Sequence, residues 1–397
     1  MSMPTTSTLP EELTSEILSR LSVKLVSRFK SVCKAWRTLI TDPVFIKLHL
    51  NRATTTAANN VHGRYYQPLF ALTRDYYSII NGYGYGRMKS PIEEVIGFCN
   101  GLLCFIGIER AIILWNPSIR EYQILPDPST QFRRLRRLQV GWGFGFHPKT
   151  GEYKVIRIAP IHTRKQNRGR LSEVKVYTVG SGSWRELENI PYRLYDESRS
   201  PQAQQALING VLHWCQCSSE TSTNVILSFD IADEQFREVP RPVFGEGPAR
   251  IRNLGVLRGC LSMLVERQKM SLGSVYEVWV MEDYGLKESW TKKINFSSSI
   301  LGYNFRPWRL LDNGEILYRI GGGNMIRLFP SLKCETAEPR SLHNWGIHSC
   351  RLVYVADFVG SLVSPKQIEN RVEKEQGKKR DEGSTLSTEK YKKLKRR

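Results

Sequence analysis

The stretch "LPEELTSEILSRLSVKLVSRFKSVCKAWRTLITDPVFIKLHL", residues 9–50, places a helical pattern at the front of a 397-residue chain. A first helix is predicted because apolar residues recur on one helical face, at Leu13, Ile17, Leu18 and Leu21. A second is indicated by apolar spacings of three and four, at Val26, Phe29, Cys33, Trp36 and Ile40. Asp42-Pro43, a capping residue followed by proline, is a start signal for a third helix.

Three helices in so short a segment cannot bury much apolar surface by themselves. Their apolar faces must be covered by the next domain or by a partner. The pattern therefore leaves two interpretations open, a helical cap on the following domain or a docking unit for another protein.

The sequence changes character after the polar stretch 51–60, which we expect to be a linker. Short aromatic and β-branched runs then alternate with turn residues. Three segments share one spacing, in which an aromatic residue is followed seven positions later by another. They begin at Trp115, Tyr177 and Phe229, and a looser copy begins at Trp279. Each predicts a β-hairpin with the two aromatic residues facing each other across it.

A second kind of turn alternates with these hairpins, at intervals of about fifty residues. Its copies lie at Asn100, Lys149, Asn209, Arg258 and Asn313. Two hairpin turns per interval make a four-stranded unit, which is typical of a propeller blade. Residues 61–363 therefore predict an all-β domain, a β-propeller of about six blades. An irregular β-sandwich is the alternative.

The net charge of +20 is concentrated in two places. Residues 132–171 hold eleven basic residues and one acidic residue, and residues 366–397 hold twelve basic and six acidic. The second region has almost no apolar residues, so we predict a disordered basic tail at 364–397. The chain begins without the basic and apolar segments of a signal peptide, so we expect it in the nucleus and cytoplasm with reduced cysteines.

Catalytic motifs are not found in the sequence. The alternating glycines of "GWGFGFH" lack the strand-to-helix context of a phosphate loop, and instead favour a strand that a neighbour approaches closely. His213, Cys215 and Cys217 would share one face of a strand, but no fourth ligand follows at a recognisable spacing. We therefore predict no enzymatic activity, no metal and no cofactor. The alternatives are a propeller enzyme resembling a glycan hydrolase, or a nucleic-acid-binding propeller with a helical cap.

The front segment resembles an F-box, the module through which substrate receptors bind the Skp adaptor of cullin-based ubiquitin ligases. The resemblance rests on "LP" at 9–10, "EILSRL" at 16–21, "RFKSVCKAWRTLI" at 28–40 and "DPVFIKLHL" at 42–50, and it is greatest with the plant form. It implies an F-box at residues 1–50. The adaptor-binding residues that we expect from it are Leu9, Pro10, Leu13, Ile17, Leu18, Leu21, Val23, Val26, Phe29, Val32, Cys33 and Trp36.

The β-domain resembles the F-box-associated interaction domain of plant F-box proteins. The matching stretches include "GFCNGLLCF", "LWNPSIREYQILP", "GWGFGFHPKTGEYKVIRI" and "LSFDIADEQFREVP". The resemblance implies the substrate-recognition subunit of an SCF-type E3 ubiquitin ligase, with a Skp-type adaptor, a cullin and a RING subunit as partners and no membrane association.

The basic concentration in the middle of the chain suggests where a target protein would bind. Like charges that lie close together repel, so the loops that carry them should project into solvent and favour an acidic partner. The residues predicted to bind the target are Arg133, Arg134, Arg136, Arg137, Arg164, Lys165, Arg168 and Arg170. A solvated rim is the plainer interpretation of the same residues, and nucleic-acid binding is less favoured because no aromatic residues are interleaved with the charges.

Overall fold

The computed structural model describes most of the helical front and of the β-domain. The described residues are 9–59, 69–73, 76–80, 84–87, 92–128, 140–161, 171–192, 205–217, 224–245, 247–269, 273–297, 306–310, 316–320, 325–329, 340–341, 352–357 and 359–368.

Four helices form the front of the described chain: α1 (Glu11–Leu18), α2 (Val23–Phe29), α3 (Lys34–Thr41) and α4 (Pro43–Asn59). The Asp42 carboxylate accepts hydrogen bonds from the backbone N–H groups of Val44 (2.7 Å) and Phe45 (3.2 Å). This satisfies donors that a helix start leaves unpaired, and it confirms the predicted start of α4.

The structure differs in two details from the helix bounds that the sequence predicts. The apolar stripe from Val26 to Ile40 is divided between α2 and α3, because Cys33 adopts an extended conformation (φ −155°, ψ 165°). Its Sγ accepts a hydrogen bond from Trp36 N–H and so caps α3. In addition, residues 51–59, predicted to be a linker, continue α4. Threonine-rich sequence has low helix propensity, so the packing of Leu50 against the β-domain explains this extension better than propensity does.

Six four-stranded antiparallel sheets, which we call blades 1 to 6, make up the described β-domain. Blade 1 contains β24 (Leu352–Asp357), β1 (Leu69–Thr73), β2 (Tyr76–Ile80) and β3 (Gly84–Arg87); blade 2 contains β4 (Ile92–Cys99), β5 (Leu102–Gly107), β6 (Ile112–Asn116) and β7 (Glu121–Leu125). Blade 3 contains β8 (Gly141–His147), β9 (Glu152–Pro160), β10 (Ser172–Thr178) and β11 (Arg185–Ile190); blade 4 contains β12 (Ala206–Ile208), β13 (Val211–Cys217), β14 (Asn224–Asp230) and β15 (Phe236–Val239). Blade 5 contains β16 (Ala249–Leu257), β17 (Cys260–Lys269), β18 (Gly273–Met281) and β19 (Trp290–Ser297); blade 6 contains β20 (Arg306–Leu310), β21 (Ile316–Ile320), β22 (Met325–Phe329) and β23 (Arg340–Ser341). Two short 3₁₀ turns, η2 (Ile108–Arg110) and η3 (Lys287–Ser289), lie in the connections of blades 2 and 5.

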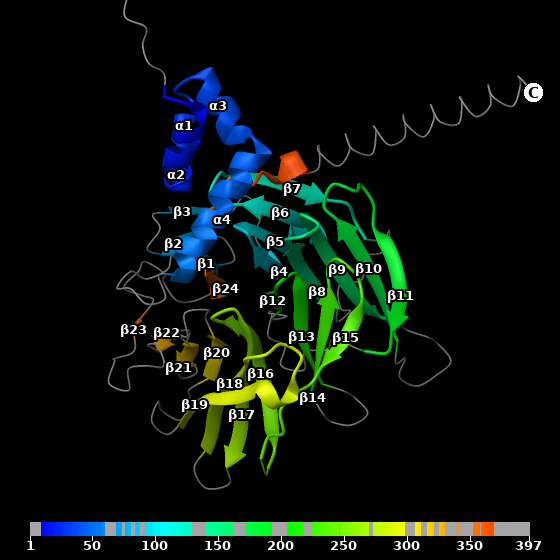
Figure 1. The fold of residues 1–397 in the computed structure, drawn as a ribbon. Helices are drawn as coiled ribbons and strands as arrows, with labels where there is room; N and C mark the ends of the chain where they lie inside the picture. Colours follow the sequence, from blue (N-terminus) through cyan, green and yellow to red (C-terminus); the bar gives the residue numbers. More distant parts are fainter. Residues whose placement is uncertain are drawn as a thin grey trace, which may run out of the picture.

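The blades are arranged around a common centre, and α1 to α3 stand to one side while α4 runs back to the ring (Figure 1). Neighbouring blades meet through their first strands, as β4 with β8 and β16 with β20. The last strand of the described domain, β24, pairs with β1, so the two ends of the domain close the ring together. This is the propeller architecture that the repeating turns predict.

The predicted turns within the described residues, together with aromatic pairs, account for the regularity of the blades, whereas the turn predicted at Asn313 lies outside the described residues. Asn100 and Asn209 adopt positive φ angles (51° and 49°), each followed by a glycine that also has positive φ. These conformations make the two-residue turns for which Asn-Gly is favoured. Across the second hairpins the rings of Tyr177 and Trp184 lie 5.5 Å apart and those of Phe229 and Phe236 lie 4.7 Å apart.

The looser copy in blade 5 does not follow this pattern. Trp290 lies opposite Met281 in the register, and Trp279 lies opposite Lys292. The longer turn between β18 and β19 shifts the two tryptophans out of alignment, so the expected aromatic pair is absent there.

The glycines of β8 let blade 4 pack closely against blade 3. A Cβ atom on Gly143 would lie 2.5 Å from the Trp214 side chain, and one on Gly145 would lie 2.6 Å from that of Ile231. Real Cβ atoms do not approach so closely, so glycine is required on this face for packing. The structural role predicted for "GWGFGFH" is therefore confirmed.

Candidate functional site

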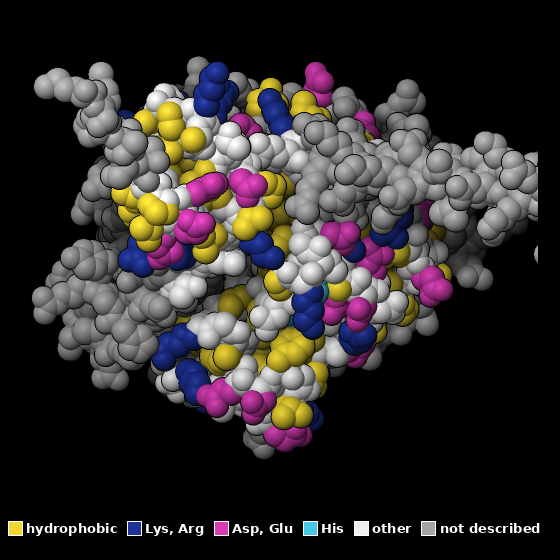
Figure 2. All heavy atoms as spheres, turned by 45° about the horizontal axis from the view of Figure 1, so that its top comes forward, with side chains coloured by type: hydrophobic (Ala, Val, Ile, Leu, Met, Phe, Trp, Pro, Cys, Tyr) yellow, Lys and Arg dark blue, Asp and Glu magenta, His cyan; other side chains and the backbone are white. Residues whose placement is uncertain are grey.

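The outer face of α1 carries apolar side chains that the fold leaves in solvent. Leu9, Leu13 and Ile17 are 56%, 53% and 53% exposed. Leu13 and Ile17 are four residues apart and so lie on one side of α1, and Leu9 directly precedes Pro10, the N-cap of the helix. Figure 2 shows hydrophobic side chains gathered on this part of the molecular surface. Large apolar residues grouped on a surface mark a place where another molecule binds.

Further exposed apolar residues lie on the other helices of this unit. Leu25 on α2, Val32 between α2 and α3, and Val44 on α4 are 41%, 60% and 77% exposed. Exposed basic side chains accompany them at Lys24, Arg28, Lys34, Arg37 and Lys47. The helical unit thus presents apolar side chains together with positive charge.

A separate set of apolar residues forms the internal core of the helical unit. Leu18, Val26, Ile40 and Phe45 are almost fully buried in one cluster. Phe29 and Trp36 pack against this cluster with their rings edge to face, 5.4 Å apart. The helices therefore pack around a buried core, which is distinct from the exposed residues of α1.

The twelve residues predicted to bind an adaptor fall into three groups in the structure. The exposed ones are Leu9, Pro10, Leu13, Ile17, Val32 and Cys33; the half-buried ones are Leu21, Phe29 and Trp36; the buried ones are Leu18, Val23 and Val26. Helical periodicity places Ile17 and Leu18 in one stripe, whereas the structure places Ile17 outside and Leu18 inside. The exposed group is the surface available to a partner, and the buried group supports it.

Polar contacts fasten α1 to α4. Arg52 on α4 donates hydrogen bonds to the Glu16 carboxylate, to Glu16 O (3.1 Å) and to Ser19 Oγ. Arg20 also bonds to Glu16 at 2.6 Å. The hydrogen bonds from Arg52 and then Arg20 hold the pKa of Glu16 below its ordinary value. His49 on α4 lies 2.8 Å from Leu21 O, and burial lowers its pKa.

The chain returns to this unit at its far end, which sequence reasoning did not find. Residues 359–368, which we call the strap, lie beside α4 and β7 (Figure 1). Leu362 belongs to the core of the helical unit, and Val363 belongs to the core of the β-domain. The described structure thus continues five residues into the stretch 364–397 that was predicted to be a tail. The sequence "SLVSP" carries no local signal of these contacts, because both partners are distant in the chain.

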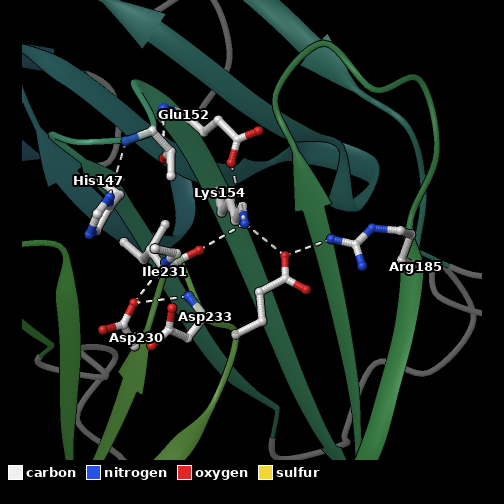
Figure 3. Close-up of polar contacts among 10 residues, drawn as sticks. His147, Glu152, Lys154, Arg185, Asp230, Ile231 and Asp233 are labelled. Carbon is white, nitrogen blue, oxygen red and sulfur yellow. Dashed lines mark hydrogen bonds and ion pairs between the residues drawn. The ribbon is translucent and has the colours of Figure 1, made fainter.

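A buried lysine joins blades 3 and 4 (Figure 3). Lys154 Nζ donates hydrogen bonds to Ile231 O (2.8 Å) and to Glu234 Oε1 (2.7 Å), and it lies 3.4 Å from Glu152 Oε2. Arg185 bonds to the same Glu234 oxygen at 2.6 Å. Burial raises the pKa of Glu234, but the hydrogen bonds from Arg185 and Lys154 outweigh it and hold that pKa below its ordinary value.

The residues predicted to bind a target lie outside the described residues. These are Arg133, Arg134, Arg136 and Arg137 in the connection from β7 to β8, and Arg164, Lys165, Arg168 and Arg170 in the connection from β9 to β10. The strand ends that flank these connections are described: Gly141 pairs with Ile158, and Pro160 pairs with Ser172. Both basic segments therefore join blade 3 at the same end.

The histidine and cysteines of "HWCQC" lie on β13. His213 is fully buried, with Nε2 2.8 Å from the Tyr284 hydroxyl and Nδ1 3.3 Å from Ala206 O. Across the described parts of the chain, no three His, Cys, Asp or Glu residues converge on a point where a metal could be held. The described helices also include none that is long and apolar enough to cross a membrane.

Comparison with known proteins identifies both parts of the chain. The family model described as "F-box domain" matches residues 7–48, and the one described as "F-box associated beta propeller domain" matches residues 79–318. The F-box/kelch-repeat protein At3g23880 of Arabidopsis thaliana is 32% identical over 91% of this chain and 96% of its own length. The F-box protein At3g07870 of the same organism is 29% identical over 85% of this chain and 89% of its own length.

Among solved structures, the β-propeller domain of the Trilobed protease from Pyrococcus furiosus covers 69% of this chain and 72% of its own chain, with 11% sequence identity and a TM-score of 0.30. This likeness is too distant to bear on function. The assignment rests instead on the family models and the relatives, together with the helical unit and the six blades. On these grounds the chain belongs to the family of F-box proteins that carry an F-box associated β-propeller domain.

Proposed function

We propose that this chain is the substrate-recognition subunit of an SCF-type E3 ubiquitin ligase. An F-box joined to a β-propeller implies the role of substrate receptor, and the F-box implies binding to a Skp-type adaptor. The finer proposal is that the adaptor connects the chain to a cullin and a RING subunit, while the propeller holds a protein target for ubiquitination.

The exposure of Leu9, Leu13 and Ile17 is the observation that carries this proposal. The helical unit already has a filled core, so these residues are not needed to hold it together. Covering three half-exposed leucine and isoleucine side chains would contribute about 1 kcal/mol each to binding, since full burial of such a side chain is worth about 1.5–3 kcal/mol. A partner with an apolar groove for α1 would therefore gain most from this face.

A binding titration of the full chain with a purified Skp-type adaptor tests the proposal. Leu13→Asp should abolish binding, because it would bury an unpaired carboxylate at the contact. Leu286→Asp is the matched control, since Leu286 on the β18–β19 hairpin is 56% exposed and lies in the propeller. Equal binding by both variants would refute the assignment of α1 as the docking helix.

In this proposal the chain performs no covalent chemistry. The reactive groups belong to the partner subunits, and the receptor raises the effective concentration of the target beside them. The same function requires two surfaces on one chain, one for the adaptor and one for the target.

We place the target surface at the basic segments that join blade 3. Several cations that lie close together in the sequence attract an acidic partner and speed its encounter, and salt screens this attraction. Replacing Arg133, Arg134, Arg136 and Arg137 with serine should reduce capture of the target and its salt sensitivity, with adaptor binding retained. Unchanged capture at low and at physiological salt would show that these charges are only a solvated rim.

A further inference from the structure

The strap connects the two hydrophobic cores of the protein through adjacent residues. Leu362 is 2% exposed and contacts the cluster of Leu18, Val26 and Phe45. Val363 is 9% exposed and belongs to the cluster that contains Leu114 of blade 2. One side of the strap therefore completes the F-box core, and the other side packs on the propeller.

Blade 2 holds the strap in place through a buried amide. Asn116 Nδ2 donates hydrogen bonds to Ser361 O (3.0 Å) and to Val363 O (2.8 Å), and its Oδ1 accepts one from Ser118 N–H (2.8 Å). Asn116 is fully buried. The two carbonyls on either side of Leu362 are thus fixed, which directs the intervening side chain into the F-box.

Further contacts extend along the strap. The Ser364 hydroxyl bonds to the Glu121 carboxylate at the start of β7, and Ile368 packs against the propeller cluster. Gly101 approaches the strap so closely that a Cβ there would lie 2.5 Å from Ser361 Cβ. The same end of the chain closes the ring, because β24 ends at Asp357, just before the strap begins.

We propose that the strap is a positioning element of the adaptor-docking unit. Leu362 completes the core that supports α1, and Asn116 holds Leu362 in register. The role of the strap in docking rests on the proposed function, whereas the role of the strap in ordering the F-box does not. The strap thereby joins the F-box to blade 2 and holds the docking unit in one position relative to the ring.

Two truncations of the full chain separate the strap from the residues that follow it. A chain that stops after Asp357 keeps β24 but loses the strap, and a chain that stops after Ile368 keeps both. Hydrogen exchange is measured on backbone amides of α1 to α4 and of the inner strands β8 and β12. The shorter chain should exchange about tenfold or more faster in α1 to α4, while β8 and β12 keep their protection. The longer chain should match the full-length protein.

Point variants test the named residues. Leu362→Asp should accelerate exchange in the helices as the short truncation does, and Leu362→Met should not, because it conserves volume. Leu286→Asp is the control for an added charge at an exposed leucine. If Leu362→Asp fails to fold, Leu362→Ala and Asn116→Ala serve instead, since each removes contacts without burying a charge. Exchange in α1 to α4 that is unchanged in these variants would overturn the proposal.

Adaptor titration of the same chains gives a second readout. If the F-box is ordered only a tenth of the time, the apparent affinity falls tenfold. The chain that stops after Asp357 should show such a loss, and the one that stops after Ile368 should bind normally. Failure of the full-length chain to bind would refute the proposed function and leave the exchange result standing. Equal affinity of the two truncations would refute the positioning role.

Discussion

Ile17 and Leu18 are neighbours in α1 with opposite environments, and substituting each in turn should separate binding from folding. Ile17 is 53% exposed, and Leu18 is 1% exposed in the core of the F-box. Ile17→Ala should change the free energy of unfolding by no more than about 0.5 kcal/mol, as surface substitutions usually do. Leu18→Ala should lower it by about 2–5 kcal/mol, because it leaves a cavity in a packed cluster.

The same comparison gives the magnitude expected for adaptor binding. About half of the Ile17 side chain remains to be covered, so its truncation should remove about 1 kcal/mol of binding free energy. This corresponds to a dissociation constant raised about fivefold, since 1.4 kcal/mol is tenfold. Ile17→Asp should weaken binding by about a hundredfold or more, because an unpaired carboxylate would be buried at the contact.

Calorimetric titration with the adaptor measures the affinities, and thermal unfolding followed by helical circular dichroism measures the stabilities. Ile17→Asp should keep the unfolding transition of the wild type and lose binding. Leu18→Ala should unfold at a lower temperature. Wild-type affinity in Ile17→Asp, or a lowered transition in that variant, would refute the division into an exposed and an internal face.

Three other predictions concern the ring and the tail. Lys154→Met should lower the free energy of unfolding, measured in urea titrations, by about 3–5 kcal/mol, because Glu234 and Ile231 O lose a buried partner. The control variant Lys149→Met, at an exposed lysine, should change that free energy little. Burial lowers the pKa of His213 to about 4, so only the unfolded chain gains this proton as the pH falls from 6.5 to 4, and the free energy of unfolding should fall by about 3 kcal/mol over that range. His213→Asn should reduce the slope of unfolding free energy against pH, and an unchanged slope would show that other groups cause it. If the basic clusters at 378–380 and 392–397 act as an import signal, deleting residues 369–397 should reduce nuclear accumulation of a fluorescent fusion and leave the unfolding free energy unchanged. An unchanged nuclear fraction would show that these clusters are not an import signal.

The blades could be predicted from the sequence because their determinants are local. In blade 2, Asn100-Gly101 sets a two-residue turn and thereby the register of β4 and β5. In blade 4, the aromatic pair of Phe229 and Phe236 lies across the hairpin of β14 and β15. A repeat of such signals gives the number of strands per blade. The count of six then follows from the length of the domain.

The docking face could be predicted only in part. Helical spacing identifies the apolar residues of α1, but both Ile17 and Leu18 satisfy it, so periodicity does not say which side a neighbour covers. That choice is made by α4 and by Leu362, which comes from more than three hundred residues away. The length of α4 was missed for the same reason, since contacts of Leu50 with the propeller stabilise a helix that its polar sequence does not favour.

The position of Leu362 gives the protein an order of assembly during its synthesis. The ribosome makes the F-box helices first, and roughly 15–60 seconds pass before Leu362 follows, at about 5–20 residues per second. Until then the helices lack a core residue, and the ring lacks β24. A chain interrupted by a premature stop codon would carry an F-box without its support. Under the proposed role of the strap, only a chain translated nearly to its end would present a fully ordered F-box, and unfinished chains should compete poorly for the adaptor.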